Sequence, residues 1–240
     1  MALVWLACLS PCSAWAQERT ELPTRPGVTE TVFVSAAAKP FASAILFPGG
    51  SGAVALTRNN FLIRVAPRFA AAGVTAAVAD APSDHAGGLD TRYRAGPDAA
   101  DDMAAVVSML QRRAAVPVWL IGTSRGSISA ANVAVRLGPP RIAGVVLTSS
   151  VWTGGMAAVP LGDLRVPVMI VHNHDDTCRN SPFEGAESAM AGLTAAPVRQ
   201  LLAVSGGTLR SNPCEAMSPH GYLGIEDQVV SPIVAWIKAH

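Results

Sequence analysis

Short apolar runs alternate with longer segments of helical periodicity along most of the chain. The runs are five to nine residues long, rich in β-branched residues and show little polar alternation. This pattern is typical of strands that are buried on both faces of a parallel sheet. The predicted strands lie in "TVFVS", "ASAILF", "VTAAVAD", "VPVWLIG", "IAGVVLTSS", "VPVMIVH" and "RQLLAVS".

The segments between these runs carry apolar residues at helical spacing, and glycine or proline follows most of them, as is usual where helices stop. We predict helices over residues 61–72, 98–114, 126–137, 182–193 and 227–238. Strand and helix repeated in alternation indicate an α/β fold. The longest irregular piece, residues 80–100, follows a predicted strand. Since ligands bind at the carboxyl ends of parallel strands, we expect it to form part of a pocket wall.

Length and charge limit the functions to consider. A chain of 240 residues without an internal repeat or a Gly/Ser linker suits one domain with a substantial core. Lys and Arg number 18 against 17 Asp and Glu, which gives a formal net charge of +1. Because there is no basic excess to neutralise a phosphate backbone, we expect no nucleic-acid partner. No glycine-rich phosphate loop opens a predicted helix.

The first sixteen residues, "MALVWLACLSPCSAWA", carry no charge and end in the small-x-small triplet 14–16. This form is typical of a secretory signal cleaved before Gln17, although a positively charged start is missing. The alternative, a buried helix or a membrane anchor, is weaker because the apolar stretch is too short to span a bilayer and contains Pro11, so we expect no stable membrane anchor. We predict a bacterial-type export signal over residues 1–16 and a periplasmic or secreted protein with a single domain over 17–240.

Cysteine use sharpens this picture. Cys8 and Cys12 fall in the predicted signal, so the exported chain keeps Cys178 and Cys214. A pair of cysteines in an oxidising compartment predicts a disulfide, with two free buried thiols as the alternative.

A serine lies between two glycines in "GTSRG", directly after the apolar run "VPVWLI" and before a predicted helix. At such a strand-to-helix turn, Gly122 and Gly126 remove side chains that would collide with neighbouring elements. The hydroxyl of Ser124 is then presented at the carboxyl edge of the sheet. A serine that only caps a glycine-rich turn is the alternative.

The arrangement resembles the nucleophile elbow of the α/β-hydrolase superfamily, and the resemblance covers most of the mature chain. It points to the small lidless serine hydrolases of the dienelactone-hydrolase and esterase type. The resemblance implies a three-layer α/β/α fold with a mostly parallel central sheet, no cofactor and a catalytic triad in the chain order Ser, acid, His. A serine hydroxyl is a poor nucleophile near neutral pH, so it requires such a base and a third group that holds the base.

The resemblance also assigns the base and the acid. His220 in "SPHGYLG" lies after the last predicted strand and before the final helix, where the superfamily has its base; a surface-loop histidine is the alternative. The loop "VHNHDDTCRNSP" is similar to the "VHGxxD" turn of such hydrolases, and matching by residue places the acid at Asp176, with Asp175 as the rival. Asn173 replaces the glycine of that turn. The predicted disulfide would tie the acid's loop to the base's loop, because its cysteines lie close to Asp176 and His220 in sequence.

Acyl transfer also requires donors for the oxyanion that develops on the carbonyl. The elbow supplies the backbone N–H of Arg125. The second donor is expected in "PGGSGA", which is similar to the superfamily's HG turn: Gly50 is the first choice and Ser51 the second, while a plain glycine-rich turn is the alternative. His172 and His174 suggest a metal pair, but an HxH that ends a buried strand is more often structural, so we expect no metal site.

The segment 151–165 leaves room for a loop and no large inserted lid. An open cleft suits a bulky, exposed or varied acyl substrate more than a small one that needs enclosure, and we expect a small-molecule or exposed ester as the substrate. The sequence therefore predicts a secreted or periplasmic serine hydrolase that cleaves a carboxylic ester through an acyl-enzyme. A peptidase or acyltransferase with the same three residues, and a binding protein that kept the fold without the chemistry, remain as alternatives.

Overall fold

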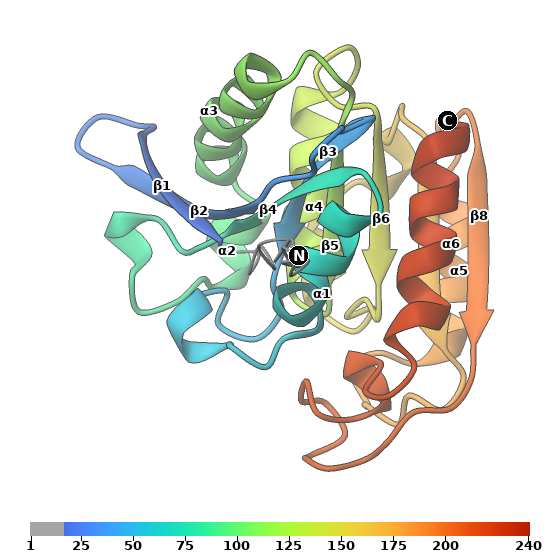
Figure 1. Ribbon diagram of the computed structural model, residues 1–240. Coiled ribbons are helices and arrows are strands. Elements are labelled where there is room, and N and C mark those ends of the chain that lie inside the picture. The colour runs from blue at the N-terminus through green and yellow to red at the C-terminus, as the bar shows by residue number, and fades with distance from the viewer. Residues whose placement is uncertain (1–16) are drawn as a thin grey trace, which may run out of the picture.

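The computed structural model describes residues 17–240, so the predicted signal over residues 1–16 lies outside the described residues. An eight-stranded sheet forms the centre of the molecule, in the order β1-β2-β4-β3-β5-β6-β7-β8 (Figure 1). β1 pairs antiparallel with β2 and β2 with β4, whereas all pairs from β4 to β8 are parallel. The strands are β1 (Glu18–Pro23), β2 (Thr29–Ser35), β3 (Ala42–Phe47), β4 (Val74–Ala79), β5 (Val118–Thr123), β6 (Gly144–Thr148), β7 (Val168–Asn173) and β8 (Arg199–Val204).

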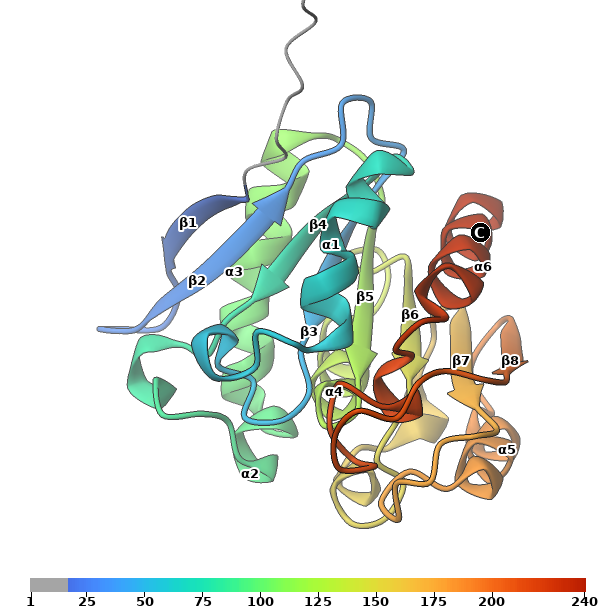
Figure 2. The ribbon, with the colours of Figure 1, turned by 60° about the horizontal axis from the view of Figure 1, so that its bottom comes forward.

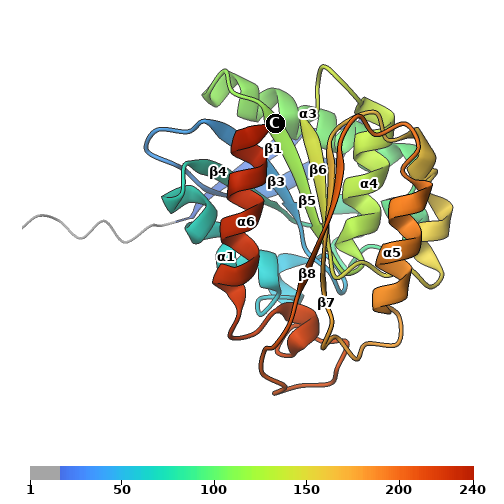
Figure 3. The ribbon, with the colours of Figure 1, turned by 90° about the vertical axis from the view of Figure 1, so that its right-hand side faces the viewer.

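Helices cover both faces of the sheet, which gives three layers (Figures 2 and 3). Helices α1 (Phe61–Ala71) and α6 (Glu226–Ala239) pack on one face, in one apolar cluster. Helices α3 (Pro97–Arg113), α4 (Gly126–Leu137) and α5 (Phe183–Gly192) pack on the other, in a second cluster. The predicted three-layer α/β/α fold with a mostly parallel sheet is confirmed. None of the helices within residues 17–240 has the length and apolarity needed to cross a membrane.

The predicted elements match the structure closely. All five predicted helices are present, with ends that differ by at most one residue, and each of the seven predicted strands is found. The sequence analysis missed β1, "ERTELP", which lies at the edge of the sheet and is mostly exposed. Its polar residues gave no apolar run, because an edge strand with solvent on its faces has little side-chain area to bury. It also missed the short helix α2 (Thr91–Arg94).

The inner strands explain where the candidate site forms. Every residue of β3, β5, β6 and β7 is buried, because helices cover both faces of these strands. These strands are parallel, so their carboxyl ends meet at one edge of the sheet, which is where open α/β sheets bind ligands. The loops that leave this edge carry the candidate chemistry.

Candidate active site

The elbow between β5 and α4 has the geometry that its glycines predict. Ser124 has a positive φ of 53°, a conformation that non-glycine residues adopt rarely and at a cost. A Cβ on Gly126 would lie 2.0 Å from the carbonyl oxygen of Phe47, and one on Gly122 would lie 2.5 Å from the carbonyl oxygen of Gly126. Neither position accommodates a side chain, so the close approach of β3, β5 and α4 holds Ser124 in its strained turn.

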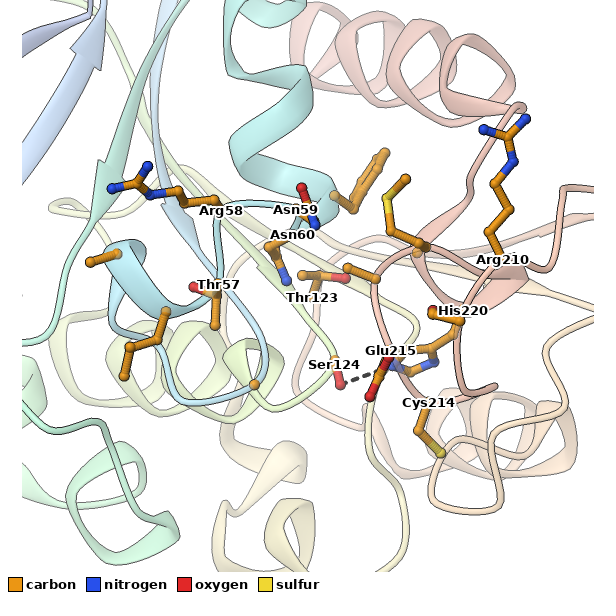
Figure 4. A pocket seen from close by; sticks show the side chains of 18 residues that line it. Thr57, Arg58, Asn59, Asn60, Thr123, Ser124, Arg210, Cys214, Glu215 and His220 are labelled. Atoms are coloured by element: carbon orange, nitrogen blue, oxygen red, sulfur yellow. Dashed lines mark hydrogen bonds between the residues drawn. The ribbon is translucent and has the colours of Figure 1, made fainter.

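The structure brings Ser124, His220 and Asp176 into one hydrogen-bonded chain. Figure 4 shows its first contact, between Ser124 and His220. Nε2 of His220 lies 2.9 Å from Oγ of Ser124, and Nδ1 lies 2.7 Å from Oδ2 of Asp176. The side chain of Asp176 is fully buried and that of His220 is 4% exposed. Because Oδ1 of Asp176 accepts a second hydrogen bond from the amide of Cys178 (2.9 Å), the carboxylate is fixed on both oxygens.

Asp175, the rival acid, points elsewhere. Its Oδ2 accepts a hydrogen bond from the amide of Gly206 at 2.6 Å, and its own amide donates to Oδ1 of Asn173 at 3.0 Å. The carboxylate of Asp175 therefore binds the loop after β8, whereas the carboxylate of Asp176 contacts His220.

The loop that carries His220 is anchored to the core on both sides of the histidine. Arg64 of α1 donates to the carbonyls of Ala216 (3.2 Å) and Gly221 (2.9 Å). The fully buried Tyr222 donates its hydroxyl to the carbonyl of Val171 at 2.8 Å, at the end of β7. Burial raises the pKa of Tyr222, so this hydroxyl keeps its proton. These contacts hold the imidazole in place over the elbow.

Two further ties join the acid's loop to the base's loop. The predicted disulfide between Cys178 and Cys214 is confirmed, with an S–S distance of 2.06 Å and a Cα–Cα distance of 4.6 Å. Nδ2 of Asn173 donates to the carbonyls of Gly206 (2.9 Å) and Pro219 (3.1 Å). The asparagine that departs from the superfamily's turn thus reaches the residue before His220, a role that the sequence analysis missed.

The glycine-rich turn after β3, residues 49–52, holds its carbonyl groups in hydrogen bonds. The carbonyl of Gly49 accepts a hydrogen bond from the amide of Gly52 at 3.1 Å. The carbonyl of Ser51 accepts one from the amide of Leu89, in the loop after β4, at 2.7 Å. The carbonyl of Gly50 accepts from the guanidinium groups of Arg94 (3.3 Å) and Arg125 (3.4 Å). All of the first three carbonyls of the turn are therefore engaged.

Three backbone amides beside Ser124, in contrast to these carbonyls, have no hydrogen-bond partner among the described residues. Within residues 17–240, the amides of Gly50, Ser51 and Arg125 have no protein acceptor. The turn also lies against the elbow, since a Cβ on Gly49 would be 2.8 Å from Cβ of Ser124. Unpaired amides next to a nucleophile, at the start of α4, are suited to bind a developing negative charge. Gly50, Ser51 and Arg125 therefore remain the candidate oxyanion donors.

His172 and His174, the pair that suggested a metal site, have other side-chain contacts. His172 is fully buried, and its Nε2 lies 2.9 Å from the carbonyl oxygen of Ser181; burial lowers the pKa of this imidazole. His174 stacks on Phe183 with ring centroids 3.8 Å apart. Within the described part of the chain, the one group of possible metal ligands is Asp176, Cys178 and His220, and the disulfide occupies the sulfur of Cys178.

A cavity of about 590 Å³ opens beside Ser124 and His220. Its walls come from two segments, residues 55–61 before and at the start of α1, and residues 210–217 before His220 (Figure 4). None of residues 80–100 lines this cavity; Ala95, Pro97 and Ala100 instead line a second cavity, which α3 and α4 border. The segment 151–165 contains only two short 3-10 turns, as expected for a chain without an inserted lid.

Comparisons with known proteins identify the fold. No protein-family model matches the sequence, and no curated protein matches it. Solved structures that share the fold include an α/β serine hydrolase homologue from Coxiella burnetii, 18% identical, with a TM-score of 0.65 over 92% of this chain and 97% of that one. An α/β serine hydrolase without a lid from Xanthomonas campestris is 14% identical, with a TM-score of 0.64 over 93% of each chain. An esterase from Pyrococcus furiosus is 13% identical, with a TM-score of 0.66 over 94% of this chain and 93% of that one.

Proposed function

We propose that this chain, which has the α/β-hydrolase fold without a large lid, is a serine hydrolase that cleaves carboxylic esters. The observation that carries the proposal is the hydrogen-bonded chain from Oγ of Ser124 through His220 to Asp176. The unpaired amides beside the serine support it, because acyl transfer needs donors next to the nucleophile.

In the proposed reaction, Oγ of Ser124 attacks the carbonyl carbon of the ester while Nε2 of His220 takes its proton. The Nδ1–H of the imidazole donates to Asp176, whose charge stabilises the imidazolium. Amides of Arg125 and Gly50 bind the oxygen of the tetrahedral intermediate. Ser124, His220 and Asp176 need no rearrangement for these proton transfers, because they are already hydrogen-bonded in this order.

Collapse of the intermediate breaks the bond to the leaving alcohol, which receives the proton from Nε2 of His220. The acyl group stays on Ser124 as an ester. Water then attacks this acyl-enzyme with His220 as the base, a second tetrahedral intermediate forms in the same amides, and its collapse releases the acid and restores the serine hydroxyl.

The cavity shape supports an accessible substrate. A site of about 590 Å³ that no lid closes admits small esters and the exposed ends of larger ones. Several proteins of the same fold are esterases by name, including a cold-adapted esterase from an Arctic intertidal metagenomic library. Ester cleavage therefore ranks above the peptidase and acyltransferase alternatives.

We also propose that the protein acts outside the reducing cytoplasm, in the periplasm or as a secreted protein. The disulfide between Cys178 and Cys214 supports this, because such bonds persist in oxidising compartments. Fractionation of producing cells, with N-terminal sequencing of the exported form, tests it. A first residue near Gln17 is expected, whereas full-length protein confined to the cytoplasm would contradict it.

The enzymatic proposal is tested with p-nitrophenyl esters of graded chain length and matched p-nitroanilides. Turnover of esters that Ser124→Ala lowers by about 10⁴-fold or more is expected. Faster cleavage of the anilides would indicate a peptidase. Folded wild-type protein that hydrolyses neither series and binds no fluorophosphonate would favour a binding protein on the hydrolase fold.

A further inference from the structure

A buried arginine lies behind the glycine-rich turn. Arg94, the last residue of α2, is 1% exposed. Its guanidinium donates to the carbonyl of Gly50 at 3.3 Å and to Oγ of Ser129 in α4 at 3.1 Å, while its Nε has no partner within residues 17–240. The side chain thus links α2 and α4 to the turn that faces the nucleophile.

No carboxylate of the described residues contacts Arg94 directly, although the charge of Asp90 lies near enough to favour its charged form. In residues 17–240 Arg94 forms no salt bridge, whereas Arg25 binds both oxygens of Asp102 at 2.9 Å. Burial, together with the nearby charge of Arg125, lowers the pKa of Arg94 to about 9, which leaves the group charged at neutral pH. A buried, unpaired charge is costly to keep, so this one is unexpected if it serves packing alone.

We infer that Arg94 is a positioning residue for the oxyanion turn: it holds the Gly50 carbonyl and sets a buried positive charge, which forms no salt bridge within residues 17–240, behind the amides that receive the oxyanion. This inference rests on the proposed function. It adds to that function a residue that neither touches the substrate nor belongs to the triad.

The geometry explains how a residue behind the turn acts at its front. The peptide unit between Gly50 and Ser51 is planar and trans, so a fixed carbonyl direction also fixes the amide of Ser51 on the opposite side. The closed turn carries this constraint to the amide of Gly50. In a buried site, the guanidinium charge is weakly screened, and negative charge that develops on the carbonyl oxygen of the substrate gains more from it than the neutral ester does.

Three variants separate this role from packing. Arg94→Met removes the charge and keeps much of the volume, Arg94→Lys keeps the charge, and Ser129→Ala removes the other hydrogen-bond partner of Arg94 as a matched control. Fluorophosphonate burst titration counts the competent sites in each preparation, so misfolded protein does not lower the measured kcat. We expect kcat per site to fall about 10- to 100-fold in Arg94→Met, with KM within about threefold of wild type. Arg94→Lys should recover most of the loss, and Ser129→Ala should stay within about twofold of wild type.

An arylboronic acid, which forms a tetrahedral adduct with an active serine, supplies the decisive readout. Its inhibition constant should rise in Arg94→Met by about the factor by which kcat/KM falls, because both depend on the same amides. An Arg94→Met protein with wild-type kcat per titrated site and wild-type boronate affinity would overturn the inference while leaving the proposed function intact. A folded wild type that neither reacts with the fluorophosphonate nor binds the boronate would overturn the proposed function, and the inference with it.

Discussion

The two halves of the candidate site are held by different physical means. On the nucleophile side, Ser124 is fixed by backbone contacts, since β3, β5 and α4 approach too closely for side chains at Gly122 and Gly126. On the acid–base side, Asp176 and His220 lie on loops that side-chain hydrogen bonds and a disulfide join.

The difference indicates how each half should respond to change. A steric contact with backbone atoms cannot be relieved locally, so an added methyl group on the nucleophile side must move whole elements. The ties of the acid–base side act in parallel, so the loss of one leaves the others in place. We therefore expect abrupt losses on the first side and graded losses on the second, except where the change removes a reacting group.

The largest effect is expected from the acid itself. Asp176→Asn should lower kcat by about 10⁴-fold, because an amide cannot stabilise the imidazolium and favours the wrong imidazole tautomer. Asp175→Asn is the matched control: it changes the adjacent carboxylate, which bonds only to the loop amide of Gly206, and should cost less than about tenfold. Ester turnover per folded molecule measures both. Equal losses in the two variants would undo the assignment of the acid.

The second largest effect is expected from a substitution in the turn that holds Ser124. Gly126→Ala places a methyl group 2.0 Å from the carbonyl oxygen of Phe47, and we expect kcat to fall at least about 100-fold together with a lower melting temperature. Gly87→Ala meets no atom within 4 Å and serves as the control, with near wild-type behaviour. Steady-state kinetics and circular dichroism melts report the two effects. A fully active, equally stable Gly126→Ala protein would show that the elbow is not closed by this contact.

Removal of the disulfide between Cys178 and Cys214 should cause a smaller loss of activity. Reduction, or the double variant Cys178→Ser/Cys214→Ser, is expected to lower kcat about tenfold at temperatures where the protein is still folded. Loop-closure entropy also predicts up to about 4 kcal/mol less stability. Ester turnover is measured with and without a phosphine reductant, and the intact mass of each sample reports whether the disulfide is present. Unchanged activity in protein whose mass shows the bridge to have been present and then reduced would contradict it.

Removal of the hydrogen bonds of the Asn173 side chain should cause the smallest loss of activity. Asn173→Ala removes two bonds to loop carbonyls, and we expect a three- to tenfold fall in kcat with little change in KM. Combined with the cysteine double variant, the loss should exceed the product of the separate effects, because both changes release the same pair of loops. Strictly multiplicative losses would mean that the two ties act independently.

The sequence predicted the nucleophile side better than the acid–base side, for a physical reason. The elbow and helix α4 depend on residues that are close in the chain, so glycine spacing and an apolar run were enough to place Ser124 and the helix 126–137. Asp176 and His220 could be placed through the resemblance to a known superfamily, but the choice between Asp175 and Asp176 depends on loop torsions that no local pattern contains.

The residues that sequence analysis missed act over long distances in the chain. Asn173 was noted only as a departure from a glycine, and its contact with Pro219 spans 46 positions. Arg94 lies 44 positions from the carbonyl that it holds. Strand β1 was missed since an exposed polar edge strand has no hydrophobic signature. In each case the signal is a tertiary contact and not a pattern of neighbouring residues.

The most direct test of the account is to map a fluorophosphonate adduct on the intact, disulfide-bonded protein by mass spectrometry of its peptides. The account predicts one stoichiometric adduct, on Ser124, that forms in the wild type and is lost in His220→Ala. An adduct on another residue, or a folded wild type that stays unmodified, would contradict it.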